Sequence, residues 1–324
     1  MVVCSFLLLF APAISAGDYP PTVRGLSYSF YRRSCPQVEI IVRNFLRQAI
    51  RNDAGLAAGL IRLHFHDCFG CDASVLLKRT ATEASELDAP PNETIRPSAL
   101  TAVTKLRTLL NNACGAVVSC ADILALAARD AVHLAGGPDY DVPLGRRDGV
   151  TIAAREHVVA AFPPPSSNVT ALLNAVTKIG LDVTDLVALS GAHTLGISRC
   201  ISFDDRLFPT QDSSMDSRFA SNLKLSCPAK NTTNTTVIDV RTPNMFDNKY
   251  YVDLVNHQGL LTSDQVLFSD DRTRGIVARF AVDQSAFFRS FAFSMVKMAQ
   301  IQVLTGVQGE IRVNCFVPNA GSGS

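Results

Sequence analysis

The sequence predicts a predominantly helical protein. Apolar residues repeat at intervals of three and four over residues 38–49 and 100–110, which places them on one face of an α-helix. Residues 120–128 are apolar apart from one aspartate, a composition typical of a helix buried on all sides. Strand patterns are sparse: residues 141–143 and 237–239 could pair, but no larger sheet is evident.

Further helical segments and the breaks between them support this fold class. The helical period continues at residues 172–179, 186–192 and 287–301. Gly136-Gly137-Pro138 ends one helix, and Gly180 ends another. The proline-rich run at 162–167 is the best candidate boundary, although a proline-rich surface turn has the same pattern.

Length and composition limit the function classes. A chain of 324 residues can form about two domains or one large core, and 47% hydrophobic residues suffice for a large interior. The net charge is +1, and no basic stripe carries interleaved aromatic residues. We therefore do not expect a protein that binds nucleic acid electrostatically.

The N-terminus has the features of a secretory signal peptide. Residues 2–10 are apolar apart from Ser5, and small residues at 13–16 provide a cleavage site, so we assign residues 1–16 to the signal. No later stretch reaches the roughly 20 apolar residues of a membrane span. We therefore expect a soluble, secreted mature protein.

The cysteines fit an oxidising compartment. Of nine cysteines, one lies in the expected signal, which leaves an even number for disulfides. Eight cysteines allow 105 pairings, so the sequence alone does not assign them. A thiolate metal site at Cys68 and Cys71 is the alternative, but the other six are too dispersed for a zinc framework. Four glycosylation sequons begin at Asn92, Asn168, Asn231 and Asn234.

Arg62 and His66 are the first candidate site residues. They follow an apolar helical run, and residues four apart on a helix share a face. A permanent cation beside an imidazole can accept a proton and stabilise the negative charge left behind. The alternative is a structural polar pair. His64 lies two residues from His66 and points to a different face, which argues against a non-haem metal pair.

His193 is the second candidate. It ends another apolar helix, within Ser-Gly-Ala-His-Thr-Leu-Gly at 190–196, where a lone histidine is often a satisfied core residue. Two facing histidines with different surroundings suggest another arrangement. One would ligate a metal or haem iron, and the other would act on what binds opposite.

The ordered motifs identify a family resemblance. From about residue 25 to residue 318, the chain resembles the plant secretory (class III) haem peroxidases. The matching blocks are Leu-Ile-Arg-Leu-His-Phe-His-Asp-Cys-Phe at 60–69, Val-Ser-Cys-Ala-Asp-Ile-Leu-Ala at 118–125, Val-Pro-Leu-Gly-Arg-Arg-Asp at 142–148, Asp-Leu-Val-Ala-Leu-Ser-Gly-Ala-His-Thr-Leu-Gly at 185–196, Arg-Thr-Pro-Asn-Met-Phe-Asp-Asn-Lys-Tyr-Tyr at 241–251 and Gly-Glu-Ile-Arg-Val-Asn-Cys at 309–315.

The resemblance implies one integral, all-α peroxidase domain. We expect about ten or more helices in two halves with haem b between them, and only minor short β-strands. The distal half would span 25–165 and the proximal half 166–318, with the C-terminal helix able to pack back on the distal half. Residues 319–324 would form a disordered tail.

The resemblance also implies roles for the proximal and edge residues. His193 would be the axial ligand of the haem iron, and Asp264 would accept the other imidazole N–H, making the ligand more electron-rich. Taken alone, Asp264 would be interpreted as a helix cap. Arg199 would pair with a haem propionate, and Pro163 would contact the reducing substrate at the haem edge. The chain has no tryptophan, so a tryptophan radical site is excluded.

On the distal side, the resemblance makes His66 the acid–base group and Arg62 the cation that assists deprotonation of peroxide. Asn92 would accept the second imidazole N–H of His66, a role that argues against its glycosylation. Phe65 would be the distal aromatic residue. Glu86 would link this network to a distal calcium region.

Disulfides and a buried ion pair are implied in the same way. The expected cysteine pairs are Cys35–Cys114, Cys68–Cys71, Cys120–Cys315 and Cys200–Cys227. Asp122 would pair with Arg146, because a lone buried carboxylate is costly.

Two calcium sites are expected from the family. The proximal ligands would be Thr194, Asp239, Thr242, Met245 (through its carbonyl) and Asp247. The distal ligands would be Asp67, Gly70, Asp72 and Ser74, with Glu86 nearby. Family members usually carry two more residues between Phe69 and Gly70, so the short loop here puts distal calcium in doubt.

The expected function is a secreted haem peroxidase that reduces hydrogen peroxide and oxidises phenolic donors in one-electron steps. The alternative is a haem-binding cell-wall protein whose short distal loop impairs catalysis. We expect a monomer located outside the cell, in the wall or in the vacuole, with no nucleic-acid or membrane partner.

Overall fold

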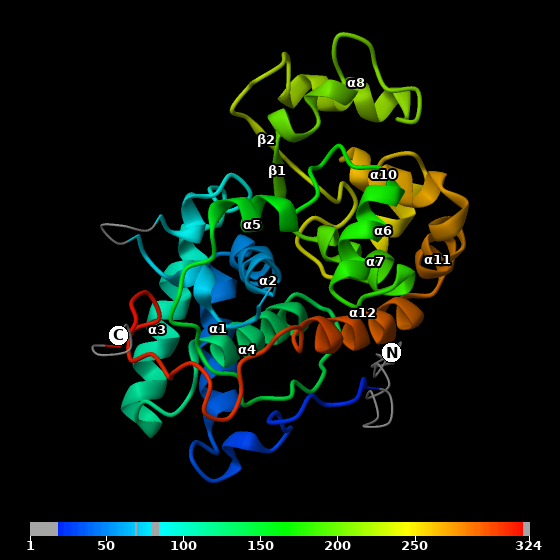
Figure 1. Cartoon of the computed structure of the whole chain (residues 1–324). Helices are drawn as coiled ribbons and strands as arrows, with labels where there is room; N and C mark the ends of the chain where they lie inside the picture. The colour runs from blue at the N-terminus through cyan, green and yellow to red at the C-terminus, as the bar shows by residue number, and fades with distance from the viewer. Residues whose placement is uncertain (1–18, 69, 80–83, 320–324) are drawn as a thin grey trace, which may run out of the picture.

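The computed structural model describes residues 19–68, 70–79 and 84–319. The expected signal peptide and residues 320–324 of the expected tail lie outside these ranges. Within them the protein is mostly helical (Figure 1). The α-helices are α1 (Val38–Asn52), α2 (Gly55–Asp67), α3 (Pro97–Cys114), α4 (Cys120–Leu134), α5 (Arg155–Ala161), α6 (Val169–Lys178), α7 (Val183–Ser190), α8 (Ser217–Ser226), α9 (Lys249–Val255), α10 (Thr262–Ser269), α11 (Asp271–Val282) and α12 (Gln284–Met298).

The one sheet of the described residues is a short antiparallel pair. Strand β1 (Ile197–Arg199) pairs with β2 (Thr235–Val237), and Ile197 lies opposite Val237. The all-α prediction is therefore confirmed, but the expected pairing of 141–143 with 237–239 is wrong. Strands of three residues are too short to produce a periodic pattern, so sequence periodicity does not detect their partners.

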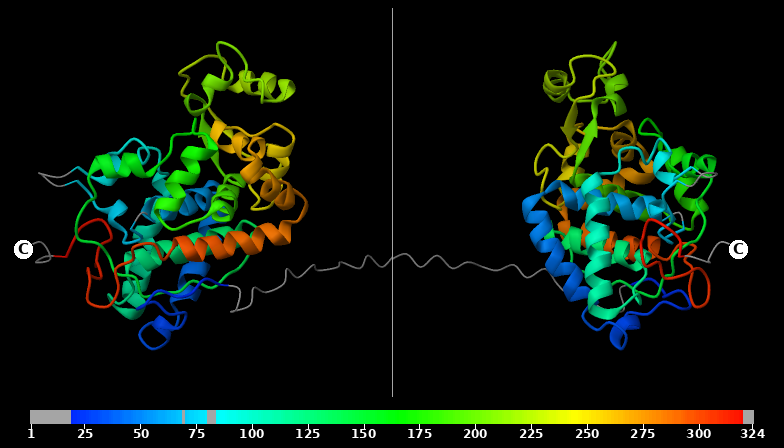
Figure 2. Two further views of the ribbon diagram at one scale, coloured as in Figure 1. Left: turned by 45° about the vertical axis from the view of Figure 1, so that its right-hand side comes forward. Right: turned by 90° about the vertical axis from the view of Figure 1, so that its left-hand side faces the viewer.

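The helices form two groups (Figures 1 and 2). In the first, α2 packs against α4, and α1 and α3 flank that pair. In the second, α7 packs against α11 and α12, while α9 and α10 pack against α11. A shared core of buried apolar side chains extends through both groups. The segment with β1, β2 and α8 projects from the second group and has its own small core. In the described ranges, no helix is both long and apolar enough to cross a membrane.

Helix α4 supports α2 and holds a buried ion pair. Nearly every residue of α4 is buried, including Asp122. The Asp122 carboxylate accepts from Arg146 Nη1 at 2.9 Å, from the Tyr31 hydroxyl at 2.8 Å and from the Gly145 amide at 2.8 Å. A buried charge persists only when it is paired and hydrogen-bonded, and Arg146 provides that pairing as predicted.

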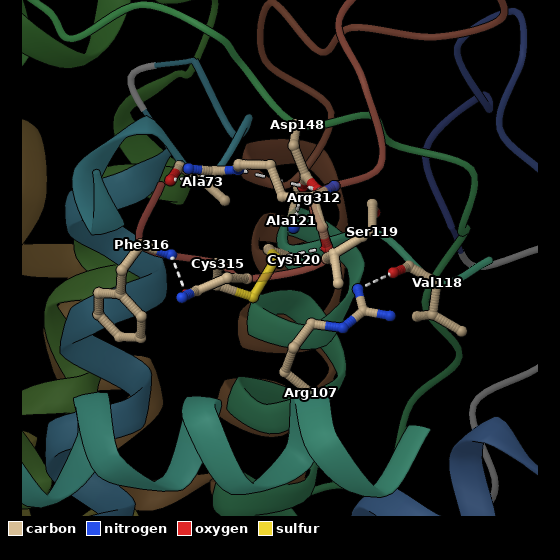
Figure 3. Close-up of a disulfide and its surroundings, with 12 residues drawn as sticks. Ala73, Arg107, Val118, Ser119, Cys120, Ala121, Asp148, Arg312, Cys315 and Phe316 are labelled. Atoms are coloured by element: carbon tan, nitrogen blue, oxygen red, sulfur yellow. Dashed lines mark hydrogen bonds and ion pairs between the residues drawn. A yellow bond between two sulfur atoms is a disulfide. The ribbon is translucent and has the colours of Figure 1, made fainter. Parts of the chain in front are cut away.

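All four expected disulfides are present. The Cys120–Cys315 bond joins the start of α4 to the C-terminal segment across 195 residues of sequence. Figure 3 shows that bond beside the buried side chains of Arg107 and Arg312. It ties the last described segment of the chain to the central helix. That segment includes Asn319 of the expected tail, whose amide donates to Glu310 at 3.0 Å.

The disulfides differ in how much they restrict the unfolded chain. Replacing both Cys120 and Cys315 by serine should lower the free energy of unfolding by about 3–5 kcal/mol, because the bond closes a very long loop. The double serine variant of Cys68 and Cys71 is the matched control, since those residues are 3 apart and close almost no loop. Denaturant unfolding of both variants measures the difference, and equal losses would contradict this account.

Candidate active site

Arg62 and His66 lie one turn apart on α2 and contact each other. Arg62 Nε donates to His66 Nε2 at 3.2 Å. The other ring nitrogen, His66 Nδ1, lies 2.5 Å from Asn92 Oδ1. The Asn92 Nδ2 group donates to the Glu86 carbonyl at 2.8 Å, which orients the amide so that its oxygen faces His66. His66 therefore carries its proton on Nδ1 and presents a lone pair on Nε2.

The surroundings of His66 keep the imidazole neutral. Burial is the main cause that lowers the pKa of His66, and the positive charge of Arg62 lowers it further. The hydrogen bond to Asn92 opposes both effects, and the resulting pKa is about 3. A neutral imidazole with an unprotonated Nε2 can accept a proton at any physiological pH.

Arg62 is held by oxygens that carry no formal charge. Its Nη1 and Nη2 groups donate to the carbonyls of Thr94 and Pro91, both at 2.8 Å, and Nη2 also donates to the Thr94 hydroxyl. Burial lowers the pKa of Arg62, and the nearby charge of Arg199 lowers it further. Because Arg199 lies close enough to repel Arg62, the two cations favour an anionic group beside them.

Aromatic rings enclose His66 on the distal side. The ring of Phe162 stacks on the imidazole with centroids 4.4 Å apart and an interplanar angle of 19°. Phe65 meets Phe162 edge-on at 5.7 Å and remains 38% exposed, although it belongs to a central helix. Sequence reasoning selected Phe65 but missed Phe162, whose position next to the proline run at 163–165 was the one available signal.

His193 and Asp264 form the expected proximal pair. His193 lies in the 3-10 turn Gly191–Thr194 that continues α7, and its Nδ1 is 2.8 Å from Asp264 Oδ1. Burial lowers the pKa of His193, but the Asp264 carboxylate outweighs burial and raises it. Arg62 opposes this rise, which means that its charge acts on both histidines. With Nδ1 bonded to Asp264, Nε2 is the nitrogen available to a metal.

Asp264 has two functions, and the sequence suggested both. Its Oδ2 accepts from the Leu261 amide at 3.1 Å and so caps the N-terminus of α10. Its Oδ1 accepts from His193 and also from the hydroxyl of Tyr250, at 3.0 Å. Tyr250 was missed, because one tyrosine in an apolar helix has no distinguishing pattern.

The two histidine sites fit a bound haem. The His193 side chain is 41% accessible, whereas its partner Asp264 is 2% accessible. The imidazole is therefore open to a group that binds beside it. His193 Nε2 suits an axial iron ligand, exposed Arg199 near Arg62 suits an anionic edge, and the Phe65 ring supplies an apolar face.

The proximal calcium residues converge on one point. The Thr194 hydroxyl donates to Asp239 Oδ2 at 2.9 Å and lies 3.3 Å from the Met245 carbonyl and 3.4 Å from Asp247 Oδ1. The Thr242 hydroxyl lies 3.0 Å from Asp247 Oδ1. In the described part of the chain no three carboxylate, imidazole or thiolate groups cluster for a metal. This set instead combines two carboxylates with hydroxyls and a carbonyl, which suits a hard cation.

The distal calcium residues line a cavity of about 320 Å³. Its lining includes Asp67, Gly70, Asp72, Ser74 and Glu86, together with His66. Asp67 is 4% exposed, and within the described residues neither of its carboxylate oxygens makes a hydrogen bond of normal geometry. Burial raises the pKa of Asp67 well above its ordinary value, and the charge of Asp72 adds to the rise. A buried carboxylate in a cavity that is also lined by Asp72 and Glu86 fits a bound cation.

The distal loop adopts strained backbone conformations. Cys71 and Ala73 have φ angles of +43° and +59°, in a region that residues with a Cβ rarely occupy. Cys71 closes the short disulfide loop, and Ala73 lies two residues after it. Phe69, where the expected shortening begins, lies outside the described residues.

The remaining candidates are Pro163, Glu86 and the asparagines of the glycosylation sequons. Pro163 is half-buried just after α5, and the Pro165 carbonyl accepts from the Ser263 amide at 2.8 Å, which joins the proline run to the start of α10. Glu86 is buried and accepts from the Ala153 amide at 3.1 Å. Asn92 is buried within the His66 network, whereas the sequon residues Asn168, Asn231 and Asn234 are exposed.

The chain is similar to known peroxidases over most of its length. The family model described as peroxidase matches residues 42–283. The chain is 58% identical to cationic peroxidase SPC4 of Sorghum bicolor over 93% of its length and 84% of that protein. It is 54% identical to peroxidase 12 of Arabidopsis thaliana, over 93% of this chain and 85% of the relative, and 48% identical to peroxidase 2 of Cucumis sativus, over 89% and 99%. The chain therefore belongs to the plant secretory (class III) peroxidase family and is a peroxidase.

Proposed function

We propose that this peroxidase is a secreted haem enzyme that uses hydrogen peroxide to oxidise small phenolic donors one electron at a time. Family membership implies haem and usually calcium. The observation that carries the proposal is the pair of histidines, one bonded to a carboxylate and one to an amide oxygen, acted on by the same guanidinium. Bound haem would supply the electron transfer between peroxide and donor.

On the distal side, His66 would accept a proton from hydrogen peroxide at Nε2. Asn92 holds the other proton at Nδ1, so Nε2 is unprotonated and would take the incoming proton in place of its contact with Arg62 Nε. Arg62 would stabilise the negative charge that develops on the peroxide, because its guanidinium is fixed by three oxygens. His66 would then return the proton to the departing oxygen from the same nitrogen.

On the proximal side, Asp264 would draw the Nδ1 proton of His193 towards its carboxylate. The hydrogen bond makes Nε2 more electron-rich and stabilises a more oxidised metal. Tyr250 and the Leu261 amide share the carboxylate, and their donation limits how strongly it attracts the His193 proton.

Phenolic donors fit the apolar border of the site. Phe65 and Phe162 present aromatic rings next to His66, and Pro163 follows directly in the chain. A phenol combines a flat apolar ring with one hydroxyl, so it would stack there and lose its proton towards the distal polar groups. High identity to proteins named peroxidases favours the enzyme over a haem-binding wall protein with impaired catalysis.

Secretion is supported by the four disulfides. We also propose two calcium ions, one at each convergent oxygen set. Asp239 and Asp247 would be the charged proximal ligands, and Asp67 and Asp72 the charged distal ones. We propose that the chain is a monomer of one integral domain with distal and proximal halves divided near residue 165.

The acid–base role of His66 can be tested by replacing it with leucine. Because proton transfer by a positioned group contributes about 100- to 10,000-fold, the rate of reaction with peroxide should fall by that range while haem remains bound. Stopped-flow absorption spectroscopy of the reconstituted protein measures this rate. His157→Leu is the matched control, since His157 is exposed and borders the same cavity outside the Asn92 network. A wild-type rate for the His66 variant would refute the role.

The calcium proposal predicts that Asp67→Asn affects stability differently with and without calcium. With calcium removed, Asp67→Asn should be neutral or stabilising, because the substitution removes a buried charge that makes no hydrogen bond of normal geometry within the described residues. With calcium present, it should lower the melting temperature and remove one bound ion. Asp247→Asn should also remove one ion, and exposed Asp205→Asn should remove none. Metal analysis that finds the same ion content in wild type and Asp67→Asn would exclude the distal site.

A further inference from the structure

Three successive backbone carbonyls converge on one buried guanidinium. Arg206 Nη1 donates to the carbonyls of Gly259, Leu260 and Leu261 at 2.6, 2.8 and 3.2 Å. Arg206 lies in the projecting segment that contains β1, β2 and α8, whereas the three carbonyls belong to the turn before α10. One cation thus joins two regions that are more than 50 residues apart in sequence.

The other two nitrogens of the Arg206 guanidinium also have polar partners. Nε donates to Asp212 at 2.8 Å, and Nη2 lies 3.3 Å from the Ser214 hydroxyl. The Arg206 side chain is 2% exposed. Gly259, Leu260 and Leu261 are buried, and their carbonyl oxygens point at one spot, where they repel each other unless a donor lies between them. The Leu261 carbonyl also accepts from amides of α10, so the Gly259 and Leu260 carbonyls depend most on Arg206. The position of this turn therefore depends on Arg206.

The same turn determines where Asp264 lies. The Leu261 amide donates to Asp264 Oδ2 at 3.1 Å, and the Leu261 carbonyl accepts from the amides of Asp264 and Gln265 at 3.2 and 3.1 Å. Leu261 is thus the residue from which α10 begins. Asp264 lies one turn further, with Oδ1 against His193. A displacement of the 259–261 carbonyls would move Asp264 with them.

We propose that Arg206 is a positioning residue of the proximal His193–Asp264 pair. Among the described residues, Arg206 makes no hydrogen bond or ion pair to either histidine. It acts by holding the first turn of α10 in the position where Asp264 contacts His193. The inference rests on the proposed role of His193 as the iron ligand. It also assigns a task to the projecting segment, whose small core includes Leu260 and Leu261.

The iron–histidine stretching frequency of the ferrous holoprotein tests this role. That frequency depends on the charge of the imidazole, and so on the His193–Asp264 hydrogen bond. Arg206→Met keeps the length of the side chain but removes every donor. It should shift the frequency in the same direction as Asp264→Asn, and combining both substitutions should add no further shift. Haem affinity should fall by about 10-fold, as for partners of metal ligands in general.

Leu223→Ala is the matched control. Leu223 is buried on α8 in the same small core, so truncation creates a cavity there without removing a donor to the turn. It should lower the melting temperature and leave the frequency at the wild-type value. The inference is overturned if Arg206→Met lowers the melting temperature but keeps the wild-type frequency, or if Leu223→Ala shifts the frequency equally.

Arg206→Lys is the second test variant, to be used if Arg206→Met does not fold. An ammonium group keeps the charge but cannot serve the carbonyls and Asp212 together, so a smaller shift in the same direction is expected. An unchanged frequency at reduced melting temperature would overturn the inference. If Asp264→Asn itself leaves the wild-type frequency unchanged, the proposed role of His193 fails, and this inference fails with it.

Discussion

The contact between His193 and Asp264 is the constraint on which the proximal half of the site depends. It joins two residues 71 positions apart, and it needs the end of α7 and the start of α10 at a fixed separation. The packing behind it leaves little freedom. A Cβ atom on Gly191 would collide with the hydroxyl of Tyr251 and the ring of Phe287, so only glycine allows the 3-10 turn to bring His193 forward. The Tyr251 hydroxyl in turn donates to the carbonyl of Val187 in α7 at 2.8 Å.

The distal half is built on a different principle. Arg62 and His66 come from one helix, so their spacing follows from helical geometry and requires no long-range placement. What must be placed is the loop that carries Pro91, Asn92 and Thr94, because its oxygens hold both side chains. The hydrogen bonds between these oxygens and the two side chains offset the cost of burying the polar groups. The proximal half instead buries one carboxylate among three donors.

The parts predicted from sequence are those whose determinants are local or belong to recognised motifs. The proximity of Arg62 and His66 could be predicted because residues four apart lie one helical turn apart. Helices α1, α3 and α4 could be predicted because their apolar residues repeat with a clear helical period. The disulfide pairs came from the resemblance. Helices α5, α8, α9 and α11 were not predicted, because their buried residues are set by tertiary contacts rather than by a clean period. Tyr250, Phe162 and Arg206 could not be found for the same reason: each gains its role from a neighbour distant in sequence.

Each histidine also has an oxygen ligand set beside it in the chain. Asp67 follows His66, and Thr194 follows His193. Within the described residues, the buried Asp67 carboxylate makes no hydrogen bond of normal geometry, and Asp239 and Asp247 share a site with the Thr194 hydroxyl. Both arrangements concentrate negative charge, so a bound divalent cation would draw each set together and fix the backbone one residue from an imidazole. The proposed calcium ions would therefore act on the orientation of both histidines through single peptide units, without contacting either ring.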